Sequence, residues 1–325
     1  MSARLVNFSR AVDPAVTEVF NGAFKQAKSV YADICSVKKA TNYITEMGAN
    51  AGLSMARLRA EQESVWYEDI LQDTGKNLTQ YEYSVGCKIS DKLQKWNKLG
   101  QIKAVVQSSA LAVARRREFD KTKLLERGYT TSYTHSVDGS SVIQLTGGGS
   151  LALFSASHAT LRSSTSRSNI IGDGTTSNMD LAEDALEAAE TVTAAAITDE
   201  NDQVMEYDLD TLFTSRKKSW TAMRLLKTSA GRIGTPNNDI NLIYGRYKLV
   251  RLDYMDSAYA DYWFLKDSAM NNNEGFMSCY EGSGLEKDGP YVDFDTKAIK
   301  YSWSFEDAAG HNKWQSYLGS QGDNT

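Results

Sequence analysis

The sequence has little histidine, cysteine or proline, and it has no long hydrophobic run. Each of these three residue types occurs only three times in 325 residues. Apolar runs are short, as in Leu151 to Phe154, so we expect no membrane-spanning segment. The first residues, MSARLVNFSRAVDP, lack the continuous apolar core of a secretory signal.

The scarce residues also argue against several kinds of site. Cys35, Cys87 and Cys279 are odd in number and far apart, so they indicate neither a disulfide framework nor metal-ligand spacing, and they fit a reducing cytoplasm. His135 and His311 have no carboxylate or cysteine nearby at metal-binding spacing. We therefore expect no metal site, no cofactor and no histidine-based catalyst.

Overall composition is that of a soluble, folded protein. Hydrophobic residues make up 41% and charged residues 24% of the chain. The net charge of −5 disfavours a chain that binds polyanions over its whole surface. The length is too great for one compact core and predicts two domains or one elongated one.

A long helix is the strongest single pattern. No proline occurs between Ser90 and Gly128, and apolar residues recur every three or four positions. They are Leu93, Trp96, Leu99, Ile102, Val106, Ala110 and Val113. Ser90 is a candidate N-cap, Gly100 is a weak point, and Gly128 can adopt the left-handed conformation that ends a helix. At about 37 residues the helix would be about 55 Å long, so we expect a strut on which other elements pack.

Two further patterns precede this helix. Asp13-Pro14 begins an amphipathic helical pattern, with proline in the first turn. Farther along, the β-prone runs Gln62–Ile70 and Leu78–Ile89 surround a polar turn at Gln72–Asn77. They predict a long hairpin that has too little apolar content for a core of its own. It needs another surface, which a neighbouring subunit can supply, and its aromatic residues Trp66, Tyr67, Tyr81 and Tyr83 are the candidate interface residues.

The second half of the chain mixes helical and strand patterns without regular alternation. A helix is predicted at Met179–Ile197, a strand at Asp210–Thr214 and a helix that begins near Ser215. Further strands are predicted at Leu242–Leu252, Tyr259–Leu265, Phe276–Tyr280 and Tyr291–Phe305. The fold class is therefore α+β with mostly antiparallel strands, and it is not a doubly wound sheet.

A run of basic residues lies near the end of the long helix. Arg115, Arg116, Arg117 and Lys121 belong to it, and acidic residues such as Asp120 interleave with them. This interleaving favours a solvated helix end with ion pairs between residues i and i+4. The alternative is a patch that contacts nucleic acid or an acidic partner.

Motifs for catalysis are weak. The glycines Gly147 to Gly149 lack the lysine and the helix that complete a phosphate-binding loop, so they predict a hairpin turn. Ser155, Ser157 and His158 offer a nucleophile and a base in one loop, but they lack the strained G-x-S-x-G turn.

The order of these parts resembles that of tailed-bacteriophage major capsid proteins with the HK97-like fold, and the later segments resemble Mu-type major head subunits. One long stretch carries most of the resemblance, YEYSVGCKISDKLQKWNKLGQIKAVVQSSALAVARRREFDKTKLLERGY from Tyr81 onward. The others are SLALFSASHATL, DLAEDALEAAETV, DLDTLFTSRKKSWTAMRLLKTS and YSWSFEDAAGHNKWQSYLGS.

The resemblance implies a domain organisation. Residues 1–52 would be an N-terminal arm and helix, 53–89 the extended hairpin loop, and 90–174 a peripheral domain with the spine helix. Residues 175–286 would be an axial domain, and 287–325 would be C-terminal strands that return to the peripheral domain.

The resemblance also implies a function without catalysis. The chain would assemble with itself into hexamers and pentamers of an icosahedral shell enclosing phage double-stranded DNA. Its further partners would be scaffolding and portal proteins, with the DNA contacted non-specifically. The product would be the virion capsid, assembled in the host cytoplasm. Two alternatives stay open at this point, an encapsulin-like nanocompartment shell and a soluble serine hydrolase that uses Ser155, Ser157 or His158.

Overall fold

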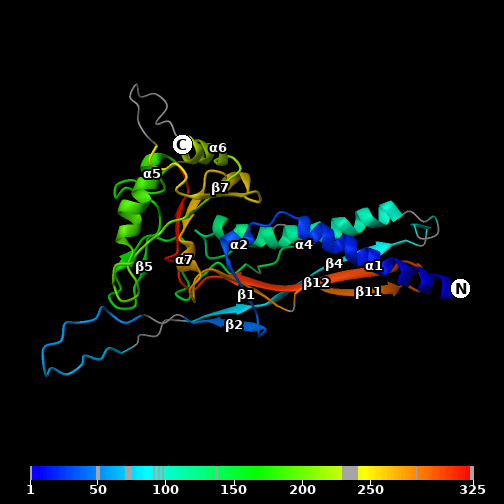
Figure 1. The fold of residues 1–325 in the computed structure, drawn as a ribbon, viewed down its shortest axis with the longest axis horizontal. Coiled ribbons are helices and arrows are strands. Elements are labelled where there is room, and N and C mark those ends of the chain that lie inside the picture. Colours follow the sequence, from blue (N-terminus) through cyan, green and yellow to red (C-terminus); the bar gives the residue numbers. More distant parts are fainter. Residues whose placement is uncertain are drawn as a thin grey trace.

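A long helix joins two β-sheets in this protein (Figure 1). The computed structural model describes residues 2–48, 52–69, 75–90, 92–93, 96, 99–135, 138–141, 143–228, 241–282 and 284–322. Helices and strands alternate irregularly along the chain, and most strand pairs are antiparallel. The predicted α+β class is confirmed.

The first sheet has five strands and is built around β12 (Ile299–Gly310). Strand β4 (Tyr81–Ile89) pairs antiparallel with β12, in register from Ile299–Ile89 to Asp307–Tyr81. The other edge of β12 pairs first with β11 (Glu286–Val292) and then with β10 (Ser278–Glu281). Strand β1 (Ser36–Lys39) completes the sheet, parallel to β10. Every second residue of β12 is buried over most of its length, because one face of the sheet carries the core.

The spine helix α4 (Leu99–Glu126) and the N-terminal helix α1 (Ser2–Gln26) form the other layer of this core (Figure 1). The buried stripe of α4 is the one predicted, namely Ile102, Val106, Ala110 and Val113. It packs in one cluster with Trp303 of β12, whose ring stacks on Phe20 of α1 at 4.4 Å. Burial of each large apolar side chain contributes about 1.5–3 kcal/mol.

The predicted bounds of both helices need correction. Helix α4 begins at Leu99 instead of near Ser90, and Trp96 is 75% exposed, so the apolar stripe is shorter than expected. The Ser90 hydroxyl accepts a hydrogen bond from the Leu93 amide at 3.4 Å, in the segment that precedes α4. Pro14 lies inside α1 and not in its first turn.

Gly128 follows the end of α4 for a reason other than the predicted one. Its φ angle is not positive, so the left-handed termination is wrong. A Cβ atom at this position would lie 2.7 Å from two ring carbons of Phe154. Glycine is therefore required by close packing against an aromatic ring and not by backbone conformation.

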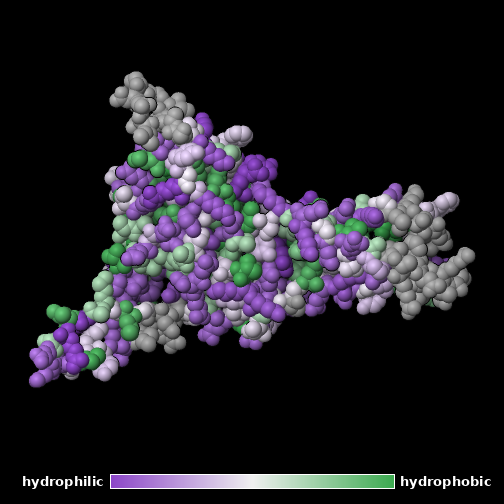
Figure 2. All heavy atoms as spheres, in the orientation of Figure 1, coloured by the Kyte–Doolittle hydropathy of each residue, from purple (hydrophilic) through white to green (hydrophobic). Residues whose placement is uncertain are grey.

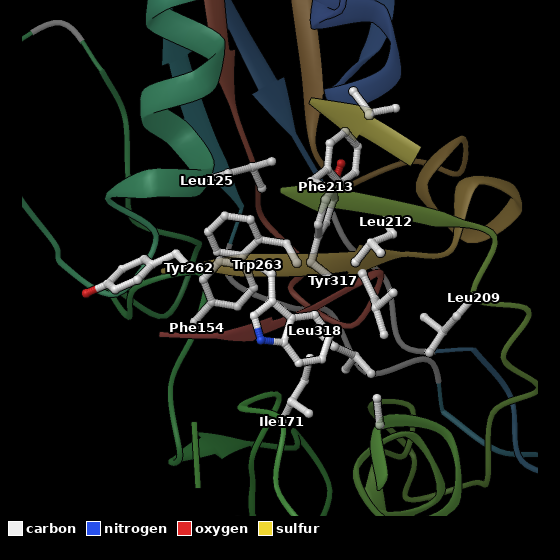
Figure 3. Close-up of a cluster of buried hydrophobic side chains, with 14 of the residues drawn as sticks. Leu125, Phe154, Ile171, Leu209, Leu212, Phe213, Tyr262, Trp263, Tyr317 and Leu318 are labelled. Atoms are coloured by element: carbon white, nitrogen blue, oxygen red, sulfur yellow. The ribbon is translucent and has the colours of Figure 1, made fainter. Parts of the chain in front are cut away.

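The second sheet has four strands in the order β13 (Tyr317–Ser320), β9 (Trp263–Lys266), β7 (Thr211–Ser215) and β8 (Lys248–Leu252). Helix α6 (Ser219–Lys227) lies between the parallel strands β7 and β8 in sequence, and α5 (Glu183–Ala188) continues as the π-helical turn η1 (Ala189–Ala194). Figure 3 shows the core around this sheet, with Phe154, Phe213, Trp263 and Tyr317 among its large rings and Leu125 of α4 reaching into it. The spine helix therefore contributes to both cores.

The remaining elements are short. They are α2 (Tyr31–Ile34), the 3-10 turn η2 (Ser257–Tyr259), α7 (Ser268–Asn271) and a two-stranded hairpin of β5 (His158–Ala159) and β6 (Ser166–Arg167). Thr146 and Ala152 form an antiparallel bridge around Gly147–Gly149, which confirms the predicted hairpin turn there.

A long loop projects from the junction of the two sheets (Figure 1). Its base is the hairpin of β2 (Ile44–Met47) and β3 (Lys76–Thr79). We call residues 52–69 the extended loop. Its turn lies at residues 60–63, where the Glu63 amide donates to the Ala60 carbonyl. The prediction that residues 62–70 form a strand is wrong for the described residues 62–69, and residues 72–74 of the predicted turn lie outside the described part.

The predicted domain boundaries stay a prediction, but the C-terminal strands can be placed. Strand β12 lies in the five-stranded sheet beneath α4. Strand β13 instead pairs with β9 in the four-stranded sheet, so the C-terminal strands do not all return to the sheet of the spine helix.

Candidate functional site

The extended loop is the candidate functional site because its apolar side chains project away from both cores. Leu53, Met55, Leu58 and Tyr67 are exposed by 62%, 69%, 100% and 87%. Figure 2 shows hydrophobic residues scattered over this projection at the lower left of the molecule. In the loop itself, the Arg57 guanidinium lies 3.7 Å from the centre of the Trp66 ring and leaves that ring 43% exposed.

A small polar cluster, which we call the loop clamp, ties the two arms of the extended loop to the body of the molecule. The Glu68 carboxylate accepts hydrogen bonds from the Ser54 amide at 2.8 Å and the Ser54 hydroxyl at 2.7 Å. Arg162, which belongs to the body, forms an ion pair with Glu68 and donates to the Ser54 hydroxyl at 3.1 Å. The hydrogen bond from Arg162, followed by those from Ser54, lowers the pKa of Glu68 to about 2.

A second contact fixes the base of the loop. The Asn201 side-chain amide donates to the Gly52 carbonyl. Neighbouring Glu200 accepts from the Leu161 amide at 3.2 Å and from Gln315 at 2.7 Å. No sequence pattern points to either contact, since Glu68, Arg162 and Asn201 are far apart in the chain.

The four predicted interface aromatics fall into two groups. Trp66 and Tyr67 lie on the extended loop and are exposed. Tyr81 and Tyr83 lie on β4 and are half-buried. The Tyr83 ring packs inside the subunit, stacked on Phe305 at 5.1 Å between ring centres. Tyr83 is therefore a core residue of the five-stranded sheet.

The basic run on α4 is mostly internal. Arg116 pairs with Asp120 at 3.0 Å, as predicted for i and i+4, and with Asp138 at 2.7 Å. Two further members of the run are more deeply placed. Arg117 is buried and bound to Glu281 at 3.1 Å, and Lys121 is buried and paired with Asp307.

The predicted ion pair between i and i+4 is present, but much of the run is buried and not solvated as expected. Arg117 and Lys121 cannot reach a phosphate while they are buried. Arg115 is the member whose side chain is exposed.

The serine and histidine loop does not form a catalytic arrangement. His158 is buried, its ring stacks on Trp314 at 4.2 Å, and its Nε2 lies 3.2 Å from the Leu153 carbonyl oxygen. The hydroxyls of Ser155 and Ser157 lie 3.2 Å apart and bond to one another. Burial lowers the pKa of His158 to about 4. These contacts are those of a structural histidine.

The described part of the chain holds no metal-ligating cluster and no disulfide. No group of three or more His, Cys, Asp or Glu residues there has the geometry to hold a metal ion. Cys35, Cys87 and Cys279 are free, buried thiols. None of the described helices is both long and apolar enough to cross a membrane.

Comparison with known proteins identifies the fold. No protein-family model matches the sequence, and neither does any curated protein sequence. Solved structures do match. One from Mycobacterium phage Adephagia has a TM-score of 0.52 and 13% identity over 92% of this chain and 91% of its own. The capsid of a native GTA particle has a TM-score of 0.51 and 13% identity over 90% and 91%.

A third structure, the procapsid of bacteriophage JBD30, has a TM-score of 0.50 and 14% identity over all of this chain and 77% of its own. At such identities the likeness concerns the fold, which extends over nearly the whole chain. The protein therefore has the HK97-like fold of phage capsid structures, as the sequence predicted.

Proposed function

We propose that this protein is a major capsid subunit, which assembles with copies of itself into hexamers and pentamers of an icosahedral shell around phage double-stranded DNA. The fold supports this proposal, because the matching structures include a capsid and a procapsid. In this role the part around the five-stranded sheet would be the peripheral domain and the part around the four-stranded sheet the axial domain.

The extended loop is the observation that carries the proposal. It is an 18-residue segment without a helix or strand, and most of its large apolar side chains are exposed. Exposed apolar area of this kind marks an interaction site, since leaving it in water has no benefit for a monomer. The natural cover is the neighbouring subunit of the shell, with Trp66 and Tyr67 as central contacts and Tyr81 near the base of the loop.

The further partners follow from the same role. Scaffolding and portal proteins would direct assembly, and the packaged DNA would be contacted non-specifically, with Arg115 as the exposed cation of the α4 run. The protein would reside in the virion capsid after assembly in the host cytoplasm. The role needs no catalytic step.

Electron microscopy of the purified protein after size-exclusion chromatography tests the proposal. We expect closed particles or rings of five or six subunits, alone or with scaffolding protein from the same phage. Particles that contain double-stranded DNA after infection would support the phage shell, whereas particles filled with protein cargo would favour the encapsulin-like alternative. A monomer in every condition, with or without scaffolding protein, would contradict both.

A loop variant tests the carrying observation. Leu58→Glu together with Tyr67→Glu places charges at two exposed positions and leaves both cores intact. We expect a folded subunit with little or no assembly, because a buried unpaired carboxylate opposes contact. Glu61→Gln, at the turn of the same loop, is the control and should assemble normally. Normal shells from the double variant would show that this loop is not an intersubunit contact.

A further inference from the structure

Helix α6 has an outer face that no other described element covers. Trp220, Arg224 and Lys227 follow one another at i, i+4 and i+7, so they lie on one side of the helix. All three are exposed, and Trp220 is exposed by 71%. The opposite side, with Ala222 and Leu226, is buried in the core of the four-stranded sheet. This outer face combines Trp220 and Arg224, two residue types that are enriched at protein interfaces, with Lys227, a type that is depleted there.

Helix α5 has an outer face of the opposite charge. Glu183 and Glu187 are spaced i and i+4 and therefore share one side of α5. Glu187 is exposed and Glu183 half-buried, while Ala185 and Leu186 on the inner side are fully buried. Like charges at this spacing repel one another, so the pair costs stability in an isolated subunit.

The two faces belong to segments of strictly separated charge. Residues 180–190 contain five carboxylates and no cation, whereas residues 216–227 contain five cations and no carboxylate. Some of these charges are neutralised within the subunit, as in the ion pairs Lys218–Asp180 and Arg246–Glu190.

The outward-facing charges have no such partner. Neither Glu183 nor Glu187 forms an ion pair with any residue that the structure describes. The same is true of Arg224 and Lys227 within the described ranges. Two carboxylates and two cations thus remain on separate helices, without an opposite charge from those residues of their own subunit that the structure describes.

The positions of these helices suit a contact between copies. In Figure 1, α5 runs down the left edge of the upper part of the molecule and α6 lies to the right of it. The extended loop also projects to the left, on the α5 side. A ring built by rotation repeats one head-to-tail contact, in which two different surfaces of neighbouring copies meet.

We propose that the α6 face of Trp220, Arg224 and Lys227 docks on the α5 face of Glu183 and Glu187 in the adjacent copy within each ring. This inference rests on the proposed function. It adds which face of each subunit meets which face of the next one around the ring. The occupant is a second copy of this chain because the chain itself carries both faces, with opposite charges. A head-to-tail contact is the arrangement that unites them in a ring. Complementary charge selects that neighbour and rejects a face-to-face pairing of like charges.

Charge reversal with complementation tests the contact. One variant carries Arg224→Glu and Lys227→Glu, a second carries Glu183→Lys and Glu187→Lys, and a third combines all four changes. Lys103→Glu, at an exposed position on α4, is the control for a charge reversal away from the contact, although it changes the net charge by half as much as a double variant does. Assembly is measured by sedimentation velocity and electron microscopy under conditions in which the wild type assembles, and folding by circular dichroism.

We expect each double variant to remain folded. The fraction of its chains that assemble should fall about tenfold or more, since like charges then meet across the contact. The assembled fraction of the combined variant should be at least about one third of that of the wild type. Opposite charges again meet across its contact, with the signs exchanged between the two faces. Double variants that assemble normally, or a combined variant that stays as poor as the doubles, would overturn the inference alone. A wild-type chain that never assembles would overturn the proposed function as well.

Discussion

Lys121 of α4 and Asp307 of β12 form an ion pair inside the protein, with side chains only 3% and 2% exposed. The other carboxylate oxygen of Asp307 accepts a hydrogen bond from the Cys279 thiol at 3.1 Å. Burial opposes the charge of Lys121, yet the attraction of the Asp307 carboxylate keeps its pKa above the ordinary value. The pair therefore locks the spine helix onto the central strand, at the point where β12 pairs with β10.

Loss of one member of this pair should be costly. We expect Lys121→Met to lower the free energy of unfolding by about 3–5 kcal/mol, because Asp307 would remain buried without its cation. Urea denaturation followed by circular dichroism measures the change. The double variant Lys121→Met with Asp307→Leu should recover much of the loss, and Lys103→Met on the exposed side of α4 should change stability little. A Lys121→Met protein as stable as wild type would show that the pair does not hold the helix.

The buried stripe of α4 makes a second prediction. Val106→Asp should prevent folding, since it places an unpaired carboxylate at a position that is fully buried. Gln107→Asp is the matched control, because the next residue along the helix is exposed. Soluble expression and the far-ultraviolet circular dichroism spectrum of both variants test this prediction. A folded Val106→Asp subunit would mean that the stripe is accessible to water.

Two glycines near the ends of α4 should behave in opposite ways. Gly128→Ala brings a Cβ atom within 2.7 Å of the Phe154 ring, and the resulting shift should cost about 1–3 kcal/mol. Gly100→Ala meets no atom within 4 Å and should be neutral or stabilising by up to about 1 kcal/mol. The unfolding midpoints of the two variants and the wild type, measured under the same conditions, test this contrast. Equal changes in midpoint for both variants would refute it.

The loop clamp predicts a protease-sensitive variant. Glu68→Gln removes the charge that binds Arg162, so trypsin should cleave after Arg57 and Arg59 about threefold faster or more, with global unfolding unchanged. Glu61→Gln, on the same loop but outside the clamp, should leave the rate unchanged. Because the pKa of Glu68 is lowered to about 2, its carboxylate stays charged at mildly acidic pH and the clamp persists. Trypsin should therefore still cleave the wild-type protein slowly at a mildly acidic pH at which the protease is active. Equal cleavage of the Glu68→Gln and wild-type proteins would contradict the clamp.

Two buried histidines predict a loss of stability in mild acid. Burial lowers the pKa of His158 to about 4 and that of His311 to about 3, from an ordinary value of 6.5. The unfolded chain therefore binds more protons than the folded chain below pH 6.5, so the free energy of unfolding falls as the pH falls from there towards 4.

Between pH 7 and pH 5 the expected loss is about 1–2 kcal/mol for each histidine, measured by urea denaturation at both pH values. His158→Gln should lower stability at pH 7 but reduce its dependence on pH. A wild-type protein equally stable at pH 7 and pH 5 would contradict the burial of these rings as neutral groups.

Much of the architecture could be predicted because its determinants are local. The spacing of Ile102, Val106, Ala110 and Val113 predicts the buried face of α4 from helical geometry alone. The alternation in β4 likewise predicts a strand. Local patterns were less reliable at the ends of elements, as the later start of α4 at Leu99 shows.

The candidate site was less predictable than the fold. Exposed aromatic residues at Trp66 and Tyr67 were expected from composition, and their exposure agrees with that expectation. The loop clamp, however, joins Ser54 and Glu68 to Arg162, about a hundred residues away, and no local pattern indicates such a pairing. The same holds for Arg117 and Lys121, whose acidic partners lie on β10 and β12 and remove them from solvent.

By itself, the sequence determined most kinds of element, with the strand expected at residues 62–70 as an exception. It also determined the buried stripe of the spine helix and the α+β class, since these depend on residues that are neighbours along the chain. Tertiary structure alone decided that β2 pairs with β3, that β13 joins β9, and that cations of α4 are buried. These outcomes depend on contacts between distant segments, and their energies arise only when the segments meet in the folded chain.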